Sequence, residues 1–529
     1  MQTNAEVLNM DGTPSLIAQV GQRMMAGFDG PRLDDKFISL VKKWKIGNVI
    51  LFKWNVTDKE QLQELCEDIQ RLVIQETGRP AFIAIDQEGG AVSRLSDDAT
   101  RVPGAMAIAA TGDPANAYSA GKITGLELRA LGVNFNLSPV LDVNSNDANP
   151  VIGVRSYGER PETVIRYALP MMRGLDDSGT LSCGKHFPGH GDTSVDSHLA
   201  LPVVDKTMDE LRSVELAPFQ AAVEAGIPAI MSSHIVFPRV DPGKPATLSR
   251  QILTGLLREE MGFQGLIMTD CLEMKAIQHT VGTVQGTVEA IKAGADLVLV
   301  SHTAALAADS AEAILRALES GELDPEEWEQ SVERIAALKA DYLNRPAPDP
   351  SIVGSDAHRR ENLDLLGRTL TPIRMPENRF PPLGDRPYFA GCPVFRATQV
   401  SNLANDPLSF PVYMAEKLGG QAEVTPSNPT AEEIAAISER ACGATSIVVG
   451  TYNGHLYPGQ LELVNRLAEL DAPVVAVALR NPYDLRSLSP NVWSLAAYEY
   501  TAQAFDAVAN VLQGKTEALG KPSVTVLTN

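Results

Sequence analysis

Between residues 15 and 302, hydrophobic positions recur with two alternating patterns. From Phe37 to Trp44, apolar residues return every three or four positions and therefore fall on one side of a helix. Gly47 interrupts this pattern, and Val49–Phe52 follows as a short uninterrupted apolar run, which is typical of a buried strand. The same succession of helical stripe and short apolar run repeats along this part of the chain.

Eight short apolar runs are candidate strands: Met24–Phe28, Val49–Phe52, Phe82–Ile85, Val133–Val140, Leu181–Lys185, Ala229–Ser233, Leu266–Thr269 and Leu297–Val300. Helical segments separate these runs, and a regular alternation of strand and helix is typical of a parallel sheet. Eight such units in succession predict an α/β fold of the (β/α)8 TIM type, a closed barrel of strands inside a ring of helices.

A long helix is expected to end the barrel near Asp324–Leu343. Asp324 is the predicted N-cap and Pro325 the first helical residue, positions that both residue types favour. Beyond this helix, Asn344–Pro350 carries prolines at alternate positions. Proline interrupts helices and sheets alike, so this segment is predicted to be a linker.

The last part of the chain again alternates between the two patterns. Apolar runs at Ser446–Val449 and Val474–Leu479 indicate buried strands, and helical patterns cover Ala431–Cys442 and Gln460–Leu470. This alternation predicts a three-layer α/β sandwich. We therefore expect a barrel domain over residues 1–343, a linker over residues 344–355 and a sandwich domain over residues 356–529.

Composition narrows the classes of partner. The 529 residues include 66 acidic and 45 basic side chains, a net charge of −21, which argues against nucleic acid or an anionic membrane as the main partner. No apolar run approaches the ~18 residues of a membrane span, and no secretory signal is visible at the N-terminus. The 5 cysteines are widely spaced and form no CxxC pair, which favours reduced thiols and a cytoplasmic location.

Acid–base groups gather in one short segment. Lys185–Asp192 together with Asp196–Ser197–His198 contains a lysine, two aspartates and three of the 8 histidines of the chain. Prolines and glycines within the segment disfavour a helix, so these groups are predicted to lie on a loop. A loop with so many ionisable groups is typical of an active site.

Other polar residues lie where a barrel places its chemistry. They follow the predicted strands at or just past the carboxyl end: Asp86, Asp142, Lys185–His186, His234 and Asp270. In TIM-type barrels this end carries the catalytic groups, so the pattern predicts an enzyme. Asp142 is expected to be a structural hydrogen-bond acceptor, and His234 could equally line the site or fill the core.

A metal site is the main alternative interpretation of the loop. His186 and His190 have the i, i+4 spacing of helical zinc ligands, but Pro188 and Gly189 between them prevent the helix that would present both on one face. We therefore expect no metal and no cofactor. His190 and Asp192 are expected to shape the loop through internal hydrogen bonds.

The polar loop resembles the signature of family 3 glycoside hydrolases, in the two-domain form of the β-N-acetylglucosaminidase, or β-hexosaminidase, branch. Further segments match this branch in order: Ile85–Gly90 with Arg94, Ser138–Asp142, Val151–Ser156, Pro245–Ser249 and Met268–Asp270, with a weaker match at Ala478–Asp484. The resemblance spans the whole predicted barrel and implies a hydrolase of sugars that contain N-acetylglucosamine.

The resemblance also implies roles for single residues. Asp270 matches the catalytic nucleophile, and His198 matches the acid/base, with Asp196 as its partner. The residues that match positions holding the N-acetylglucosamine unit are Asp86, Arg94, Arg155, Lys185 and His186. Cys271 stands where many relatives carry a second acidic residue after the nucleophile.

These residues suit a retaining exo-β-N-acetylglucosaminidase that acts on muropeptide-type or chitin-type fragments. A histidine has an ordinary pKa of ~6.5, so His198 can donate and recover a proton near neutral pH, with Asp196 orienting its ring. Because a deprotonated histidine is neutral, it also tolerates an anionic acceptor, so a phosphorylase of the same fold stays open. A non-catalytic sugar-binding or sensing protein is the alternative from another class. The expected partner is a small carbohydrate, and the chain is expected to be a monomer or homodimer.

Overall fold

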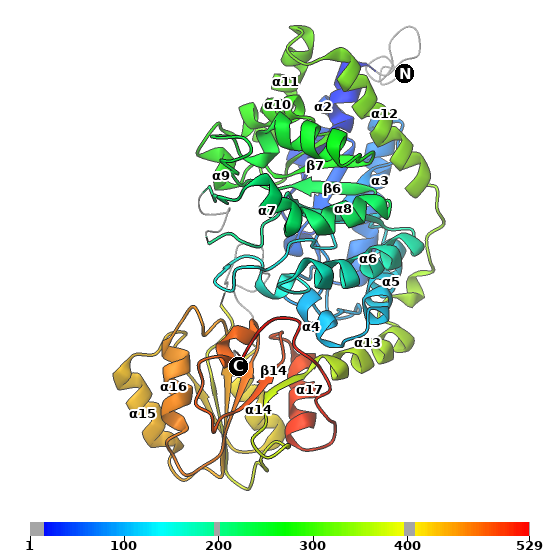
Figure 1. Cartoon of the computed structure of the whole chain (residues 1–529). Coiled ribbons are helices and arrows are strands. Elements are labelled where there is room, and N and C mark those ends of the chain that lie inside the picture. The colour runs from blue at the N-terminus through cyan, green and yellow to red at the C-terminus, as the bar shows by residue number, and fades with distance from the viewer. Residues whose placement is uncertain (1–14, 195–200, 396–407, 528–529) are drawn as a thin grey trace.

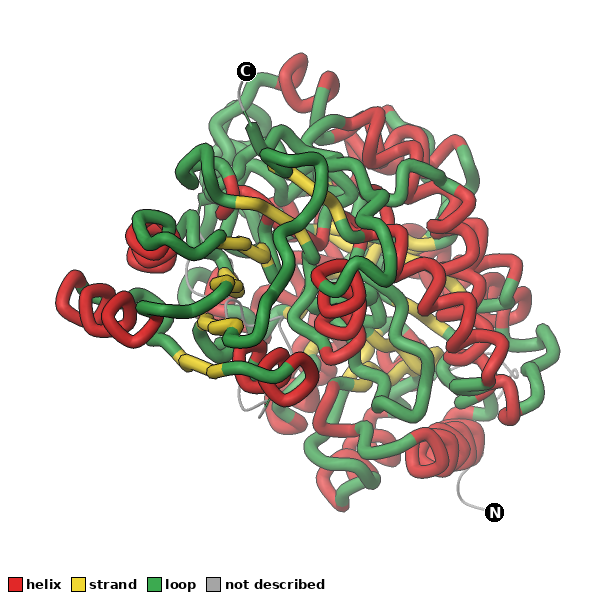
Figure 2. Tube along the Cα trace, turned by 90° about the horizontal axis from the view of Figure 1, so that it is seen from below, coloured by secondary structure: helices red, strands yellow, loops and turns green. Residues whose placement is uncertain are grey.

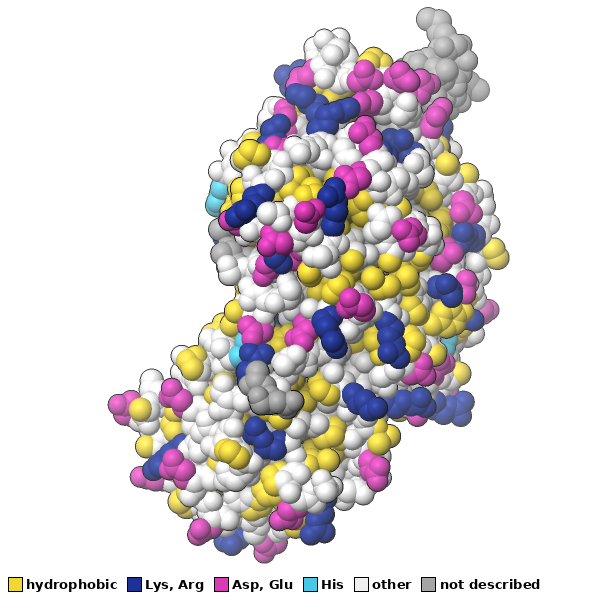
Figure 3. Space-filling model, viewed as in Figure 1, with side chains coloured by type: hydrophobic (Ala, Val, Ile, Leu, Met, Phe, Trp, Pro, Cys, Tyr) yellow, Lys and Arg dark blue, Asp and Glu magenta, His cyan; other side chains and the backbone are white. Residues whose placement is uncertain are grey.

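The structure, a computed structural model, describes residues 15–194, 201–395 and 408–527. These residues form a barrel and a second, smaller layered domain beside it (Figure 1). No helix in the described ranges is long and apolar enough to cross a membrane. Acidic and basic side chains lie interspersed on the face shown in Figure 3.

The barrel consists of eight parallel strands that pair in chain order and close with β1 against β8. The strands are β1 (Met24–Ala26), β2 (Asn48–Leu51), β3 (Phe82–Ile85), β4 (Phe135–Asn136), β5 (Leu181–Phe187), β6 (Ala229–Ser232), β7 (Leu266–Cys271) and β8 (Leu297–Val300). The predicted TIM-type barrel is therefore confirmed.

One strand is much shorter than its apolar run. The run Val133–Val140 contributes only Phe135–Asn136 to β4. Pro139 has no backbone N–H to donate to a neighbouring strand, and Val140 forms only an isolated bridge with Lys185. The prediction of a longer fourth strand was therefore wrong.

Helices surround the barrel. They are α1 (Leu16–Gln22), α2 (Asp35–Trp44), α3 (Lys59–Thr77), α4 (Ala105–Ala110), α5 (Ala115–Ala130), α6 (Pro161–Asp177), α7 (Met208–Ser213), α8 (Leu216–Glu224), a π-helix at Gln251–Glu260, α9 (Lys275–Gln278), α10 (Thr283–Ala293), α11 (Ala304–Glu319) and α12 (Pro325–Tyr342). Asp324 caps α12 by accepting hydrogen bonds from the backbone N–H groups of Glu326 and Glu327, as expected.

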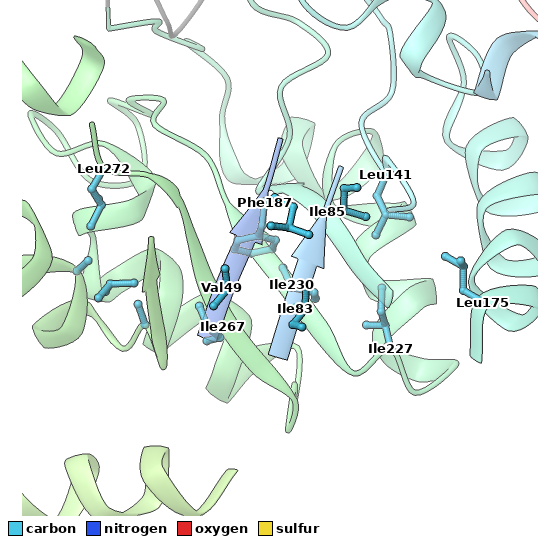
Figure 4. Packing of buried hydrophobic residues seen from close by; sticks show 14 of the residues in the cluster. Val49, Ile83, Ile85, Leu141, Leu175, Phe187, Ile227, Ile230, Ile267 and Leu272 are labelled. Atoms are coloured by element: carbon cyan, nitrogen blue, oxygen red, sulfur yellow. The ribbon is translucent and has the colours of Figure 1, made fainter. Parts of the chain in front are cut away.

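Alternate strand residues face opposite sides of the barrel wall. In β3, Phe82 and Ala84 belong to the cluster that fills the barrel, whereas Ile83 and Ile85 belong to the cluster between strands and helices. Figure 4 shows Ile83 and Ile85 in this outer layer together with Ile267 of β7. Both faces of β3 are thus apolar, which explains why such a strand appears in the sequence as an uninterrupted apolar run.

The second domain is built on a six-stranded sheet of order β11-β10-β12-β13-β14-β9, in which only β9 is antiparallel to its neighbour. Its strands are β9 (Thr371–Arg374), β10 (Pro387–Gly391), β11 (Gln421–Val424), β12 (Ser446–Thr451), β13 (Val474–Ala478) and β14 (Trp493–Ala496). Its helices are α14 (Phe410–Leu418), α15 (Ala431–Ala441), α16 (Gly459–Leu467) and α17 (Ala502–Leu512). α13 (Asp356–Thr369) precedes the sheet and packs against α4 and α5 of the barrel as well as α17.

Helices cover both faces of this sheet. Side chains of α15 and α16 pack on one face, and those of α14 and α17 pack on the other. Figure 2 shows the row of strands with helices on either side. The expected three-layer α/β sandwich is therefore confirmed. The loops that follow β13 and β14 reach the barrel, where Tyr483 contacts Asn144 and Glu499 contacts Gly104.

Candidate active site

The carboxyl ends of β3 and β5 bring oppositely charged side chains together. The Lys185 ammonium lies 2.6 Å from Asp86 Oδ1 and 2.7 Å from Glu88 Oε1. Arg94 Nη2 lies 3.9 Å from Asp86 Oδ2. Lys185 is buried, and burial alone would lower its pKa, but the two carboxylates raise that pKa above its ordinary value. Lys185 is therefore a firmly charged donor at the strand end.

Glu88 links Lys185 to Arg155. The Arg155 guanidinium donates to both carboxylate oxygens of Glu88, from Nε at 2.9 Å and from Nη2 at 2.8 Å. Burial favours the protonated form of Glu88, but Arg155 and Lys185 together hold the pKa of this carboxyl well below its usual range. Sequence reasoning assigned no role to Glu88, although its place two residues after Asp86 in a glycine-bounded turn was a usable signal.

His186 joins the cluster of Glu88, Lys185 and Arg155 through its imidazole ring. Its Nδ1 lies 2.7 Å from Asp142 Oδ2, and its Nε2 lies 3.5 Å from Arg155 Nη2. Asp142 Oδ1 also accepts hydrogen bonds from the backbone N–H groups of His186 and His190, at 3.1 and 2.7 Å. Asp142 is fully buried and thus acts as the expected structural acceptor, which orients the His186 ring and holds the start of the loop.

Consecutive residues of β5 both serve the site because the strand is irregular there. In a regular strand, neighbouring side chains point to opposite faces. The register of β5 against β6 shifts between Lys185 and Phe187, as at a β-bulge. Lys185 and His186 can therefore both reach the group around Glu88 and Arg155.

Asp270 lies near the carboxyl end of β7. Its Oδ1 accepts a hydrogen bond of 2.7 Å from the backbone N–H of Cys271. Burial raises the pKa of the Cys183 thiol in β5, the charge of Lys185 lowers it, and the charges of Asp86 and Asp270 raise it. Because the strands of a closed parallel barrel all end on one side, Asp270 near the end of β7 shares the barrel mouth with Lys185 near the end of β5.

His234 is a buried histidine that contacts the backbone of Cys271, the residue after Asp270. Its Nδ1 lies 2.8 Å from Thr247 Oγ1, and its Nε2 lies 2.9 Å from the carbonyl oxygen of Cys271. Both ring nitrogens are therefore engaged by the protein, which favours the structural interpretation over direct contact with a substrate.

The segment after β5 is partly described. His190 is buried, with Nδ1 2.8 Å from Thr193 Oγ1, and burial together with the charge of His186 lowers its pKa to about 4. Lys206 Nζ lies 2.9 Å from Asp192 Oδ2. These contacts agree with the loop-shaping roles expected for His190 and Asp192. Asp196 and His198 lie outside the described residues.

The assembled group suits a polyhydroxylated ligand. It presents fixed donors on Lys185, Arg94 and Arg155 beside carboxylate acceptors, and sugar hydroxyls need both kinds of partner when they are buried. In the described ranges, no group of three or more His, Cys, Asp or Glu side chains is arranged to hold a metal ion.

Comparison of the sequence with known protein families identifies the barrel. A model of the glycosyl hydrolase family 3 N-terminal domain matches residues 15–338. The chain belongs to glycosyl hydrolase family 3. Beta-hexosaminidase A from Pseudoalteromonas piscicida is 38% identical to this family 3 chain over 368 residues, which cover 65% of the chain and 62% of that relative. The chain thus matches less than two thirds of that relative's length.

Two solved structures extend the comparison. The family 3 β-N-acetylglucosaminidase from Paenibacillus sp. str. FPU-7 is 36% identical, with a TM-score of 0.89 over 97% of this chain and 99% of that one. NagZ from Neisseria gonorrhoeae, in complex with N-trifluoroacetyl-D-glucosamine, is 31% identical, with a TM-score of 0.54 over 66% of this chain and 98% of that one. The expected membership of glycoside hydrolase family 3 is therefore confirmed, and the similar proteins belong to its β-hexosaminidase branch.

Proposed function

We propose that this family 3 chain is a retaining exo-β-N-acetylglucosaminidase that removes terminal N-acetylglucosamine from muropeptide-type or chitin-type fragments. The observation that carries the proposal is the network of Asp86 with the buried Glu88, Lys185 and Arg155, which lies at the end of the barrel where β7 carries Asp270. The similar proteins support it, since the structure from Paenibacillus is that of a β-N-acetylglucosaminidase.

In the proposed first step, Asp270 is the nucleophile. A carboxylate oxygen attacks the anomeric carbon, the bond to the leaving-group oxygen breaks, and that oxygen takes a proton from His198. A covalent glycosyl-enzyme results. Asp270 lies within β7 of the rigid barrel, one residue before its end, so its position is fixed before the substrate arrives.

In the proposed second step, His198 acts as a base. It removes a proton from water, the water oxygen attacks the anomeric carbon, and the bond to Asp270 breaks, which restores both groups. Two displacements at the same carbon retain its configuration. Asp196 would hold the histidine ring and stabilise its protonated form.

The sugar would be held by side chains that the structure fixes in advance. Lys185 and Arg155 are both bound to Glu88, while Asp86 and His186 are oriented by Lys185 and Asp142. Asp86, Arg94, Arg155, Lys185 and His186 are the proposed contacts to the N-acetylglucosamine unit. Preorganised partners lower the entropy cost of binding.

The test is a substrate panel with product identification. The chain is incubated with N,N′-diacetylchitobiose, an N-acetylglucosaminyl muropeptide and an aryl N-acetylglucosaminide, each with and without phosphate. The proposal predicts release of N-acetylglucosamine, first formed as the β-anomer in an NMR time course. Formation of N-acetylglucosamine 1-phosphate would instead identify a phosphorylase, and binding without turnover would identify a sugar-binding protein.

A further inference from the structure

Three aromatic rings, of the exposed Trp54 and His302 and the half-buried Phe52, form a group at the carboxyl ends of β2 and β8. Phe52 and Trp54 stack with ring centroids 4.6 Å apart and an interplanar angle of 17°. The His302 ring lies 4.8 Å from the Phe52 ring and 5.8 Å from the Trp54 ring. Trp54 is 44% exposed, which is unusual for so large an apolar side chain and leaves part of the indole available to a ligand.

The indole of Trp54 is held in place by the turn that carries it. Its Nε1 donates a 3.1 Å hydrogen bond to the carbonyl oxygen of Phe28. Asn55 ties the same turn down, because its Nδ2 donates to Phe28 O at 3.0 Å and to Gly30 O at 2.7 Å. Trp54 is therefore a rigid platform, and a ligand that stacks on it loses little entropy to ordering the ring.

Contacts on two sides join this platform to the sugar site. On one side, Lys53 Nζ lies 3.3 Å from the carbonyl oxygens of both Arg94 and Leu95. On the other side, Glu273 Oε2, three residues beyond Asp270, accepts a 2.6 Å hydrogen bond from the backbone N–H of His302. The platform thus forms the rim of the barrel mouth between the segment of Arg94 and the segment of Asp270.

We propose that Trp54, supported by Phe52 and His302, is the subsite for the leaving group and that it binds a neutral pyranose ring. This inference rests on the proposed function and specifies its substrate class. An aromatic face offers apolar surface to the C–H groups of a sugar ring but no formal charge with which to pair a carboxylate. Lys53, the cation of the same turn, directs its ammonium to carbonyl oxygens. A chitin-type leaving group therefore fits this rim better than one that carries a carboxylate.

The test compares leaving groups with and without a ring. Wild type, Trp54→Ala and Trp54→Phe are assayed on N,N′-diacetylchitobiose and on N-acetyl-β-glucosaminyl fluoride. Both substrates are cleaved at the same anomeric carbon, but the fluoride loses a C–F bond and its leaving group, fluoride ion, has no ring. Trp54→Ala should lower kcat/KM for the disaccharide by about tenfold or more, mainly through KM, and should affect the fluoride far less. Trp54→Phe should recover most of the loss.

Controls separate a subsite from a structural role. Ile74→Ala removes an apolar side chain that is 47% exposed on α3, and it should leave kcat/KM unchanged for both substrates. An equal loss of Trp54→Ala activity on both substrates, or no loss on either, would overturn the subsite. Wild type should also have a higher kcat/KM for diacetylchitobiose than for the disaccharide whose reducing sugar carries a lactyl carboxylate. The reverse order would overturn the inference that the subsite binds a neutral ring.

Failure of the proposed function gives a different result. If wild type turned over no substrate, the enzymatic proposal would fall, while calorimetry would still test the platform. The subsite predicts that Trp54→Ala weakens binding of diacetylchitobiose by about tenfold and changes binding of N-acetylglucosamine much less. Equal affinities of wild type and Trp54→Ala for the disaccharide would then reject the platform.

Discussion

Glu499 is a buried carboxyl at the contact between the two domains, and its replacement by glutamine should change how stability depends on pH. Its Oε1 accepts a 2.7 Å hydrogen bond from the backbone N–H of Gly104. It lines a cavity of about 10 Å³ together with Glu88 and Arg155 of the proposed sugar site. A Cβ added to Gly90 would come within 2.9 Å of the same oxygen, so the carboxyl is tightly enclosed.

Burial raises the pKa of Glu499 from its ordinary value of 4.5 to about 7, although the Gly104 hydrogen bond and the charge of Arg101 oppose this shift. Between these two values the folded protein holds a proton that the unfolded chain has lost. The free energy of unfolding therefore falls as pH rises through this interval. From pH 5 to pH 8 the loss amounts to about 2–3 kcal/mol.

Glu499→Gln removes this ionisation and keeps an oxygen that can accept from Gly104. Urea unfolding of wild type and variant at several pH values gives the comparison. The free energy of unfolding of wild type should fall by about 2–3 kcal/mol relative to that of Glu499→Gln between pH 5 and pH 8. Glu416→Gln, the same change at an exposed position of α14, is the matched control. A constant difference between wild type and Glu499→Gln over this range would show that the enclosure does not suppress ionisation, contrary to our reasoning.

Further predictions concern the site and the core. Asp270→Ala should abolish turnover of an aryl N-acetylglucosaminide, while the exposed Asp209→Ala should not; near-normal activity of Asp270→Ala would reject the proposed nucleophile. His198→Ala should lose far less rate on a substrate with a good leaving group than on a disaccharide, and equal losses would argue against an acid role. Glu88→Gln removes the charge shared by Lys185 and Arg155 and should raise KM more than it lowers kcat, which steady-state kinetics would reveal. Ile267→Ala removes a fully buried side chain and should lower the free energy of unfolding by about 2–5 kcal/mol in urea titrations.

Much of the fold follows from local patterns that the sequence displays directly. The barrel strands are buried on both faces, so each appears as an apolar run, and β3 and β8 match their predicted ranges. Asp324 and Pro325 mark the start of α12, because helix capping depends on residues adjacent in the chain. The polar residues at the ends of the predicted strands, such as Asp270, could likewise be placed at the catalytic end, since all strands of a parallel barrel end on one side.

Contacts between residues far apart in the chain were decided only by tertiary structure. Glu88 and Arg155 are 67 positions apart, and Glu499 and Gly104 are 395 apart. Local periodicity determines whether a segment is a helix or a strand, but not which distant side chains meet when the barrel closes and the second domain packs against it. The ion pairs of Glu88, the enclosure of Glu499 and the platform of Trp54 all depend on that packing, which is why neither composition nor spacing could predict them.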